Sequence, residues 1–443
     1  MLKRFIVENF SSYRDESILE LTAGKSTTYT DHVVNFKNTK ILKSAIIYGA
    51  NASGKSNLIK AIEYAQGIIE NGLNDTDTYK KYFRLDAISS KKETKFEFEL
   101  ELDGVFYSYG FSSILNTKEV SEEWLYRIDT SSPKMIFERK KNKINLGKQL
   151  KDKTLNARFE IYSEDMKNQS NQLFLNEIAK KELDIDEVKI LNDIYYWFEK
   201  RLIILYPHSK YDGISSIATN NNLSKIFKKY LNEFDTGVID ISTIEENFEE
   251  SLKNLPLNVK KDIEKELVED DKALKAYLSF QGNYFTIYKD ENSDLKVQRL
   301  GLIHSKEFDE AFELKDESDG TQRLFDLIPL LSKFEEDYTI VIDEFDRSLH
   351  PKLARRLFEL FYKIEDSKSQ LIVTTHESNL LDLELLRRDE IWFAEKDKEG
   401  ASKLFSLNQF KVRYDKQIEK AYLLGRYGAV PFFKTFDDIE WES

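Results

Sequence analysis

The chain has 443 residues, 41% of them hydrophobic and 33% charged, which is typical of a globular protein with room for two or three domain-sized units. It contains no stretch of about 18 apolar residues, so we expect no membrane contact. The absence of cysteine excludes disulfides and cysteine nucleophiles and favours a reducing, cytoplasmic location. A net charge of −13 argues against a surface devoted to nucleic acid.

A local basic surface is compatible with that net charge. The densest basic run is residues 139–143, Arg-Lys-Lys-Asn-Lys, and Lys148, Lys151 and Lys153 follow it. We interpret this run as the rim of a solvated loop or hairpin, and DNA binding stays an unsupported alternative.

The N-terminal part of the chain has the pattern of an antiparallel β lobe. Residues 95–112 alternate apolar and polar on both sides of Asp103-Gly104, which is a strong hairpin signal. Further strand-like segments lie at residues 2–10, 17–21, 124–128 and 135–138. We therefore expect a first segment, residues 1–150, that combines this lobe with a phosphate-binding loop.

The pattern turns helical after about residue 155. Helices are predicted at residues 171–181, 185–201, 222–234, 244–255 and 259–278, with one buried strand at 202–206. Strands are expected again at 285–288, 295–302, 311–315 and 338–342, with a helix at 320–334. These patterns divide the rest of the chain into a mainly helical insert, residues 151–278, and a C-terminal lobe, residues 279–443.

The most informative segment follows the apolar strand Ala45 to Tyr48. It matches the phosphate-binding loop G-x-x-x-x-G-K-[ST] at every fixed position and opens a predicted helix at Asn57. Its residues are Gly49, Ala50, Asn51, Ala52, Ser53, Gly54, Lys55 and Ser56. The glycines let backbone N–H groups face a phosphate, Lys55 reaches the β- and γ-phosphates, and Ser56 ligates Mg²⁺. The sequence therefore predicts a site for a nucleotide and Mg²⁺.

A second apolar strand, residues 339–342, ends in the two carboxylates Asp343 and Glu344. Buried parallel strands have continuous apolar sequences, and ligands bind at their carboxyl ends. We expect Asp343 to hold Mg²⁺ directly or through water, and Glu344 to orient or deprotonate the attacking water.

A third strand, residues 370–373, leads to Thr374-Thr375-His376. It follows the acidic strand by the length of one crossover helix, so His376 is expected at the same edge of the sheet. There it would donate to the γ-phosphate and sense whether that phosphate is present.

The segment 317–323, Glu-Ser-Asp-Gly-Thr-Gln-Arg, opens the helix before the acidic strand. Taken alone it is an ordinary helix N-cap, with Ser318 or Asp319 as the capping residue.

The order of these motifs resembles a known family. It runs from Gly49–Ser56, through a long insert, to Ser318-Asp319-Gly320-Thr321, Asp343-Glu344, Ser348-Leu349-His350-Pro351 and His376. The chain is similar to soluble ABC-type ATPases of the chromosome-maintenance and overcoming-lysogenization-defect branch. The nearest likeness is to stand-alone prokaryotic ATPases of anti-phage, abortive-infection systems, whose terminal "GRYG-x-x-P" segment is matched by residues 425–431.

The resemblance implies an α/β fold, a two-lobed P-loop ATPase head with an antiparallel β lobe and a helical insert between the lobes. It also implies that Ser318 and Gly320 contact the γ-phosphate held by a second copy of the chain, so that a homodimer or larger ring encloses ATP. The turn at residues 11–14 would lie near the nucleotide. The signature departs from the common L-S-G-G-Q at Glu317, Asp319 and Thr321, and we find no glutamine for a Mg²⁺-sensing loop near residues 82–86.

Three functions compete at this point. The first is a defence ATPase that responds to a phage-encoded trigger and controls a separate effector, a toxin or nuclease. The second is a DNA-repair or chromosome ATPase that acts on DNA directly, and the third is the motor of a membrane transporter. The long insert between Lys55 and Ser318 disfavours the transporter, and the absence of a heptad array disfavours the second.

A second catalytic site within the chain is not expected. Asp184-Ile185-Asp186 has the D-x-D spacing of a metal nuclease but precedes a helical segment, so a helix N-terminus is the favoured interpretation. The effector would then be a different protein.

Overall fold

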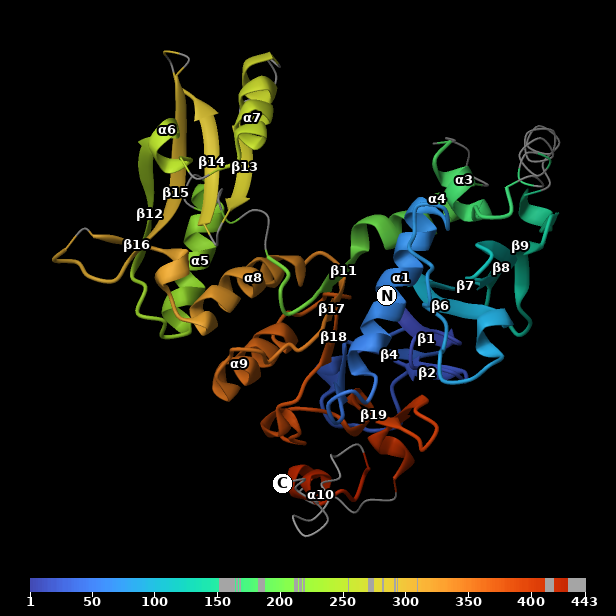
Figure 1. The fold of residues 1–443 in the computed structure, drawn as a ribbon. Coiled ribbons are helices and arrows are strands. Elements are labelled where there is room, and N and C mark those ends of the chain that lie inside the picture. The colour runs from blue at the N-terminus through green and yellow to red at the C-terminus, as the bar shows by residue number, and fades with distance from the viewer. Residues whose placement is uncertain are drawn as a thin grey trace, which may run out of the picture. The chain divides into compact units, whose positions relative to one another are not determined.

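The structure is a computed structural model that describes residues 1–150, 164, 166, 169–181, 188–210, 214, 217, 220–253, 255–269, 275–280, 283–290, 292, 294–308, 310–410 and 418–428 (Figure 1). The chain divides into two units. The first comprises Met1–Pro207, Phe334–Asp346 and Ala354–Ser443, and the second comprises His208–Lys333 and Arg347–Leu353. Among the described residues, no helix is long and apolar enough to cross a membrane.

The antiparallel lobe of the first unit is a seven-stranded sheet in the order β10-β9-β8-β7-β6-β1-β2. Its strands are β1 (Leu2–Glu8), β2 (Ser17–Glu20), β6 (Thr94–Leu102), β7 (Val105–Ile114), β8 (Glu119–Arg127), β9 (Lys134–Lys140) and β10 (Lys143–Leu146). The predicted hairpin is confirmed: Asp103 and Gly104 both have positive φ, 50° and 81°, as a two-residue turn between twisted strands requires.

One face of this sheet packs on helix α1 (Lys55–Asn71). The alternating Phe96, Phe98 and Leu100 are fully buried and share one core with Leu58 and Ile62 of α1. The P-loop leads directly into α1. Because α1 is packed in the core of the β lobe, this core also holds the P-loop in position.

The second sheet of the first unit has the order β11-β17-β18-β5-β19-β20. Its strands are β11 (Leu202–Leu205), β17 (Thr339–Ile342), β18 (Gln370–Thr374), β5 (Ser44–Tyr48), β19 (Ile391–Lys396) and β20 (Ser402–Ser406). The first five run parallel, and β20 returns antiparallel beside β19. Every residue of β5, β17 and β18 is buried, which explains the apolar runs at residues 45–48, 340–342 and 371–373.

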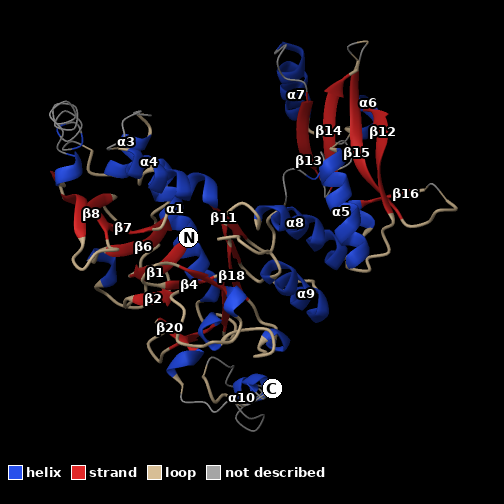
Figure 2. Ribbon diagram, turned by 180° about the vertical axis from the view of Figure 1, so that it is seen from behind, coloured by secondary structure: helices blue, strands red, loops and turns tan. Residues whose placement is uncertain are grey.

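Shorter elements complete the first unit. They are β3 (Val33–Asn35), β4 (Lys40–Leu42), α3 (Phe174–Ala179), α4 (Lys189–Tyr196) with a π-helical turn at Trp197–Arg201, most of α9 (Pro351–Tyr362), and α10 (Ile418–Leu423). The α/β class and the antiparallel β lobe expected from the sequence are therefore confirmed (Figure 2).

The second unit is built on a five-stranded antiparallel sheet, in the order β12-β15-β14-β13 with β16 also on β15. Its elements are α5 (Asn221–Glu233), β12 (Asp240–Asn247), α6 (Phe248–Ser251), α7 (Leu257–Glu269), β13 (Lys275–Phe280), β14 (Asn283–Lys289), β15 (Leu295–Ile303), β16 (Ala311–Glu313) and α8 (Asp319–Lys333).

Two helix predictions in this unit are wrong at one end. Residues 244–247 belong to strand β12, and the helix predicted to run to residue 278 ends at Glu269 before strand β13. The apolar spacing from Ile244 to Leu255 is helical, but pairing of β12 with β15 along its whole length overrides that local preference. The division of the chain at residues 150 and 278 stays a proposal.

Candidate nucleotide-binding site

The P-loop connects the carboxyl end of β5 to the start of α1. Lys55 Nζ donates hydrogen bonds to the Gly49 and Ala50 carbonyls, at 2.7 and 3.2 Å, so the loop curls around its own lysine. Asn51 and Ala52 are exposed at the apex, and Ala52 has a φ of +62°. The loop therefore has the closed turn that a phosphate cradle requires.

Glycine is needed at both ends of the loop. Gly54 has a φ of +115°, and a side chain there would collide with Ser402. A Cβ on Gly49 would come within 2.6 Å of Ser53 Oγ, a buried atom without a hydrogen-bond partner among the described residues. A buried hydroxyl without a partner, in a loop whose glycines leave no room for side chains, fits a bound phosphate.

The structure brings the acidic strand to the P-loop. Ser56 Oγ donates to Asp343 Oδ1 at 3.1 Å, and Thr374 Oγ1 donates to the same oxygen at 2.6 Å. Asp343 is 4% exposed. A serine hydroxyl next to an aspartate carboxylate is an oxygen donor set of the kind that Mg²⁺ prefers, so the two predicted metal ligands fit that ion.

Glu344 has an unusual backbone conformation beside Asp343. Its φ is +47°, and its N–H donates to Thr374 Oγ1 at 2.8 Å. A non-glycine residue in the left-handed region is strained, and strained residues of this kind cluster at functional sites. Thr374 thus holds both acidic residues from the neighbouring parallel strand.

His376 lies next to the P-loop lysine, with its Nδ1 3.3 Å from Lys55 Nζ. Burial lowers the pKa of His376, and the nearby Lys55 ammonium lowers it further. Burial also lowers the pKa of Lys55, to about 8, although Asp343, Asp346 and Glu344 oppose the shift. A neutral imidazole therefore accepts from the ammonium through Nδ1 and keeps Nε2–H as a donor.

Two distant segments brace the P-loop from behind. Ser402 Oγ, in β20, donates to the Ser53 carbonyl at 2.7 Å and accepts from Ser12 Oγ at 2.8 Å. Tyr13 OH donates to the Gly54 carbonyl at 3.1 Å, and Asn57 Nδ2 donates to Ser12 Oγ at 2.8 Å. The turn at residues 11–14 is therefore in direct contact with the loop.

A basic cavity lies next to these hydrogen bonds. It has a volume of about 700 Å³ and is lined by Ser12, Asn57, Lys60, Lys80, Lys81, Arg84 and Lys396, among others. Aromatic side chains including Phe10, Tyr64 and Phe83 also line it. Cations and ring faces at the end of the P-loop are suited to a ribose and a base.

Ser318 and Gly320 belong to the second unit. Ser318 Oγ accepts from Thr321 N at 3.2 Å and so caps α8, which is the ordinary interpretation of this segment. A Cβ on Gly320 would lie 2.9 Å from the Ser348 carbonyl, and Ser348 has a φ of +61°. The structure therefore packs the start of α8 against the loop at Ser348.

Two residues of the site have no sequence signal of their own, and one predicted surface residue is buried. The sequence places Thr374 only at the end of a strand, and Ser402 belongs to no motif. Arg139 is fully buried and donates to the carbonyls of Lys141, Gln169 and Gln172, so it is not part of a basic surface. Asp184, Asp186, Lys151, Lys153 and residues 429–431 lie outside the described residues.

Comparison with solved structures gives low similarity over most of the chain. A structure described as the SmcHead bound to the C-winged helix domain of ScpA shares 14% identity and a TM-score of 0.40, covering 91% of this chain and 97% of the other. The SMC head domain from Thermotoga maritima shares 14% identity and a TM-score of 0.37, covering 91% and 98%.

Comparison with sequences identifies the family. No curated protein matches the chain. The sequence model of a family described as "AAA domain, putative AbiEii toxin, Type IV TA system" matches residues 44–382, which include the P-loop, Asp343, Glu344 and His376. Because this match covers well over half of its residues, the chain belongs to this AAA-domain, AbiEii-type family.

Proposed function

We propose that the chain binds ATP with Mg²⁺ and hydrolyses it to ADP and phosphate. The observation that carries this proposal is the meeting of Ser56, Asp343 and Thr374 beside a buried P-loop lysine. Gly49 to Asn57 would hold the phosphates through backbone N–H groups and the Lys55 ammonium. Bound Mg²⁺, held by Ser56 and Asp343, would neutralise phosphate charge.

Side chains of the chain would position the attacking water and bind the γ-phosphate. Glu344 lies beside the metal ligand, where its carboxylate would orient the attacking water and accept its proton. Lys55 would turn from the Gly49 and Ala50 carbonyls to the phosphates, and His376 Nε2–H would donate to the γ-phosphate. The basic cavity at Lys60, Lys80 and Arg84 would take the nucleoside.

A second copy of the chain would complete the site. Ser318 and Gly320 of one copy would contact the γ-phosphate bound to the other, giving a homodimer that encloses two nucleotides, or a larger ring built on the same contact. Support comes from the motif order and from the packing of Gly320 on the loop at Ser348.

The biological role we propose is regulation of a separate effector in a prokaryotic anti-phage system. The family's description names a putative toxin of a toxin–antitoxin system, which favours a defence context. The closed, ATP-bound assembly would hold a toxin or nuclease in the cytoplasm, and a phage-encoded trigger would release it. Direct action on DNA is the alternative, and the burial of Arg139 removes one cation from the basic run that would favour it.

The test compares ATP turnover and ATP binding in the wild type, Glu344→Gln and Lys55→Ala. Glu344→Gln should bind ATP as the wild type does and hydrolyse it about 100-fold more slowly, because it lacks the acceptor for the water proton. Lys55→Ala should lose binding. Wild-type turnover by Glu344→Gln would refute the role given to Glu344, and steep DNA stimulation would favour the alternative.

A further inference from the structure

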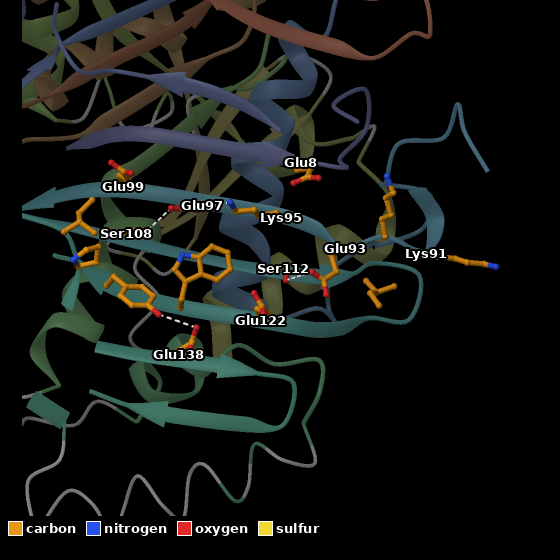
Figure 3. Close-up of a pocket in the computed structure, with 16 residues that line it drawn as sticks. Glu8, Lys91, Glu93, Lys95, Glu97, Glu99, Ser108, Ser112, Glu122 and Glu138 are labelled. Carbon is orange, nitrogen blue, oxygen red and sulfur yellow. Dashed lines mark hydrogen bonds and ion pairs between the residues drawn. The ribbon is translucent and has the colours of Figure 1, made fainter. Parts of the chain in front are cut away.

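The face of the seven-stranded sheet that points away from α1 is hollowed. A cavity of about 1010 Å³ lies on it, lined by alternate residues of β6, β7 and β8 and by residues of β1 and β9 (Figure 3). Ser108 and Ser112 of β7 form its buried floor, with Gly110 between them on the same face. We call this hollow the sheet groove. It belongs wholly to the first unit and contains none of the nucleotide-site residues.

The outer face of an antiparallel sheet is ordinarily polar and solvated, and the sheet groove combines such polar residues with five apolar or aromatic ones. Trp124 and Tyr126 of β8 line it, together with Ile114, Ile128 and Pro133. A Cβ on Gly110 would lie 2.4 Å from the Trp124 indole, so the glycine lets the indole lie on the floor. Concave shape and partly exposed aromatic rings, such as those of Trp124 and Tyr126, are typical of the centre of a protein interface.

Carboxylates outnumber cations among the residues that line the groove. Six carboxylates line it, from Glu8, Glu93, Glu97, Glu99, Glu122 and Glu138, against three ammonium groups, from Lys91, Lys92 and Lys95. Figure 3 shows these carboxylates spread over several neighbouring strands rather than gathered at one point. Lys3 and Arg4 pair with Glu99 at one end, and Lys140 lies 3.7 Å from Glu122 at the other.

The chain itself shows how a cation is held at the centre of the groove. Lys95 Nζ lies 3.2 Å from Glu97 and 3.3 Å from Glu16, and 5.8 Å from the centre of the Trp124 ring. Two carboxylates and an indole face are a favourable environment for an ammonium or guanidinium group. The same carboxylates would repel the phosphates of a nucleic acid.

We propose that the sheet groove is a docking site for an extended, cationic segment of a partner protein. The arginine or lysine side chains of that segment would reach Glu93 and Glu122 and stack on Trp124, while its apolar side chains would cover Ile114 and Ile128. The volume is at the upper end of what ligand pockets enclose, which suits several residues of a peptide better than one small cation.

The probe is a fluorescein-labelled deca-arginine peptide, with its binding to the full chain followed by anisotropy at low salt. Glu93→Gln with Glu122→Gln should weaken binding at least about tenfold, because each lost charge-assisted hydrogen bond is among the stronger polar contacts. Lys91→Glu with Lys92→Glu, at exposed positions on the groove's rim, should strengthen binding about threefold or more.

The matched control is Glu365→Gln with Asp366→Asn, which removes the same charge at exposed positions after α9. It should bind the peptide as the wild type does. Equal weakening by the control and the groove variant would show that only net charge attracts the peptide and would overturn the proposal. An unchanged affinity in Lys91→Glu with Lys92→Glu would overturn it as well, independently of any loss of folding in the first variant.

Discussion

Ser56 and Asp343 are separated by 287 positions in the sequence, and the Ser56 hydroxyl donates a 3.1 Å hydrogen bond to Asp343 Oδ1. The bond joins the start of α1 to the end of β17. Asp343 follows β17, and Ser56 follows β5 by way of the P-loop. These two strands are not neighbours, because β18 lies between them. Thr374, at the end of β18, spans that gap and holds Asp343 in place.

Replacing Thr374 should therefore damage the site without touching the predicted ligands. Thr374→Val removes the donor to Asp343 Oδ1 and the acceptor for Glu344 N–H, so we expect ATP turnover to fall about 10- to 100-fold, as for other residues that orient metal ligands. Thr374→Ser keeps the hydroxyl and should retain most activity. Steady-state turnover at saturating ATP measures both, and equal loss in the two variants would argue against the hydroxyl's role.

The pKa of Lys55 predicts how ATP affinity depends on pH. Burial lowers this pKa to about 8, so the free protein carries the ammonium below pH 8 and loses it above. Since the phosphates need the charged form, affinity should be flat below pH 8 and fall by up to about tenfold per pH unit above it. Titration calorimetry from about pH 7 to 9.5 measures this.

Lys55→Arg is the control for that titration, because its guanidinium stays charged throughout the range. Its weaker binding should not change with pH. A wild-type dissociation constant that is level across the whole range would contradict the lowered pKa of Lys55.

Ser402 should support the P-loop from β20. Its hydroxyl bonds the Ser53 carbonyl and Ser12 Oγ, so Ser402→Ala should cost about 1 kcal/mol in loop order and raise the ATP dissociation constant several-fold. Ser406→Ala in the same strand removes only the cap on Asn408 N and should leave the affinity unchanged. If the ATP dissociation constant rises equally in both variants, β20 affects ATP binding only through the overall stability of the protein.

Glu123 predicts a stability effect unrelated to nucleotide. It is fully buried, and it accepts from Phe174 N at 2.6 Å, Leu175 N at 3.0 Å and Tyr109 OH at 3.1 Å. Glu123→Gln should lower the free energy of unfolding by about 2 kcal/mol, because an amide group then faces buried donors. Glu122→Gln, on the opposite face of β8, should change it by less than about 0.5 kcal/mol in denaturant unfolding. If both variants lose a comparable free energy of unfolding, the burial of Glu123 does not explain the effect of its substitution.

Much of the nucleotide site was predictable because its parts end buried parallel strands. The apolar runs of β5, β17 and β18 placed Lys55, Asp343 and His376 at one edge of one sheet, and the hydrogen bonds of Ser56 and Lys55 bring them together. The hairpin at Asp103-Gly104 was equally clear, since its turn residues specify a local backbone conformation.

What the sequence did not show depends on long-range pairing. Residues 244–247 have helical spacing and become a strand only because β15 is available to pair with them. Ser402 reaches the P-loop through the antiparallel return of β20, and the burial of Arg139 requires the carbonyls of residues 169–172. No local pattern encodes such contacts.

Native mass tests the claim that a second copy of the chain completes the ATP site. With ATP and Mg²⁺, the Glu344→Gln variant should assemble into a species of at least twice the 52.1 kDa chain mass. If the variant is already an oligomer without ATP, then ATP should double its number of subunits. Adding Ser318→Arg should block that gain and leave ATP binding intact. A mass that ATP does not change, in protein saturated with ATP, would contradict the claim.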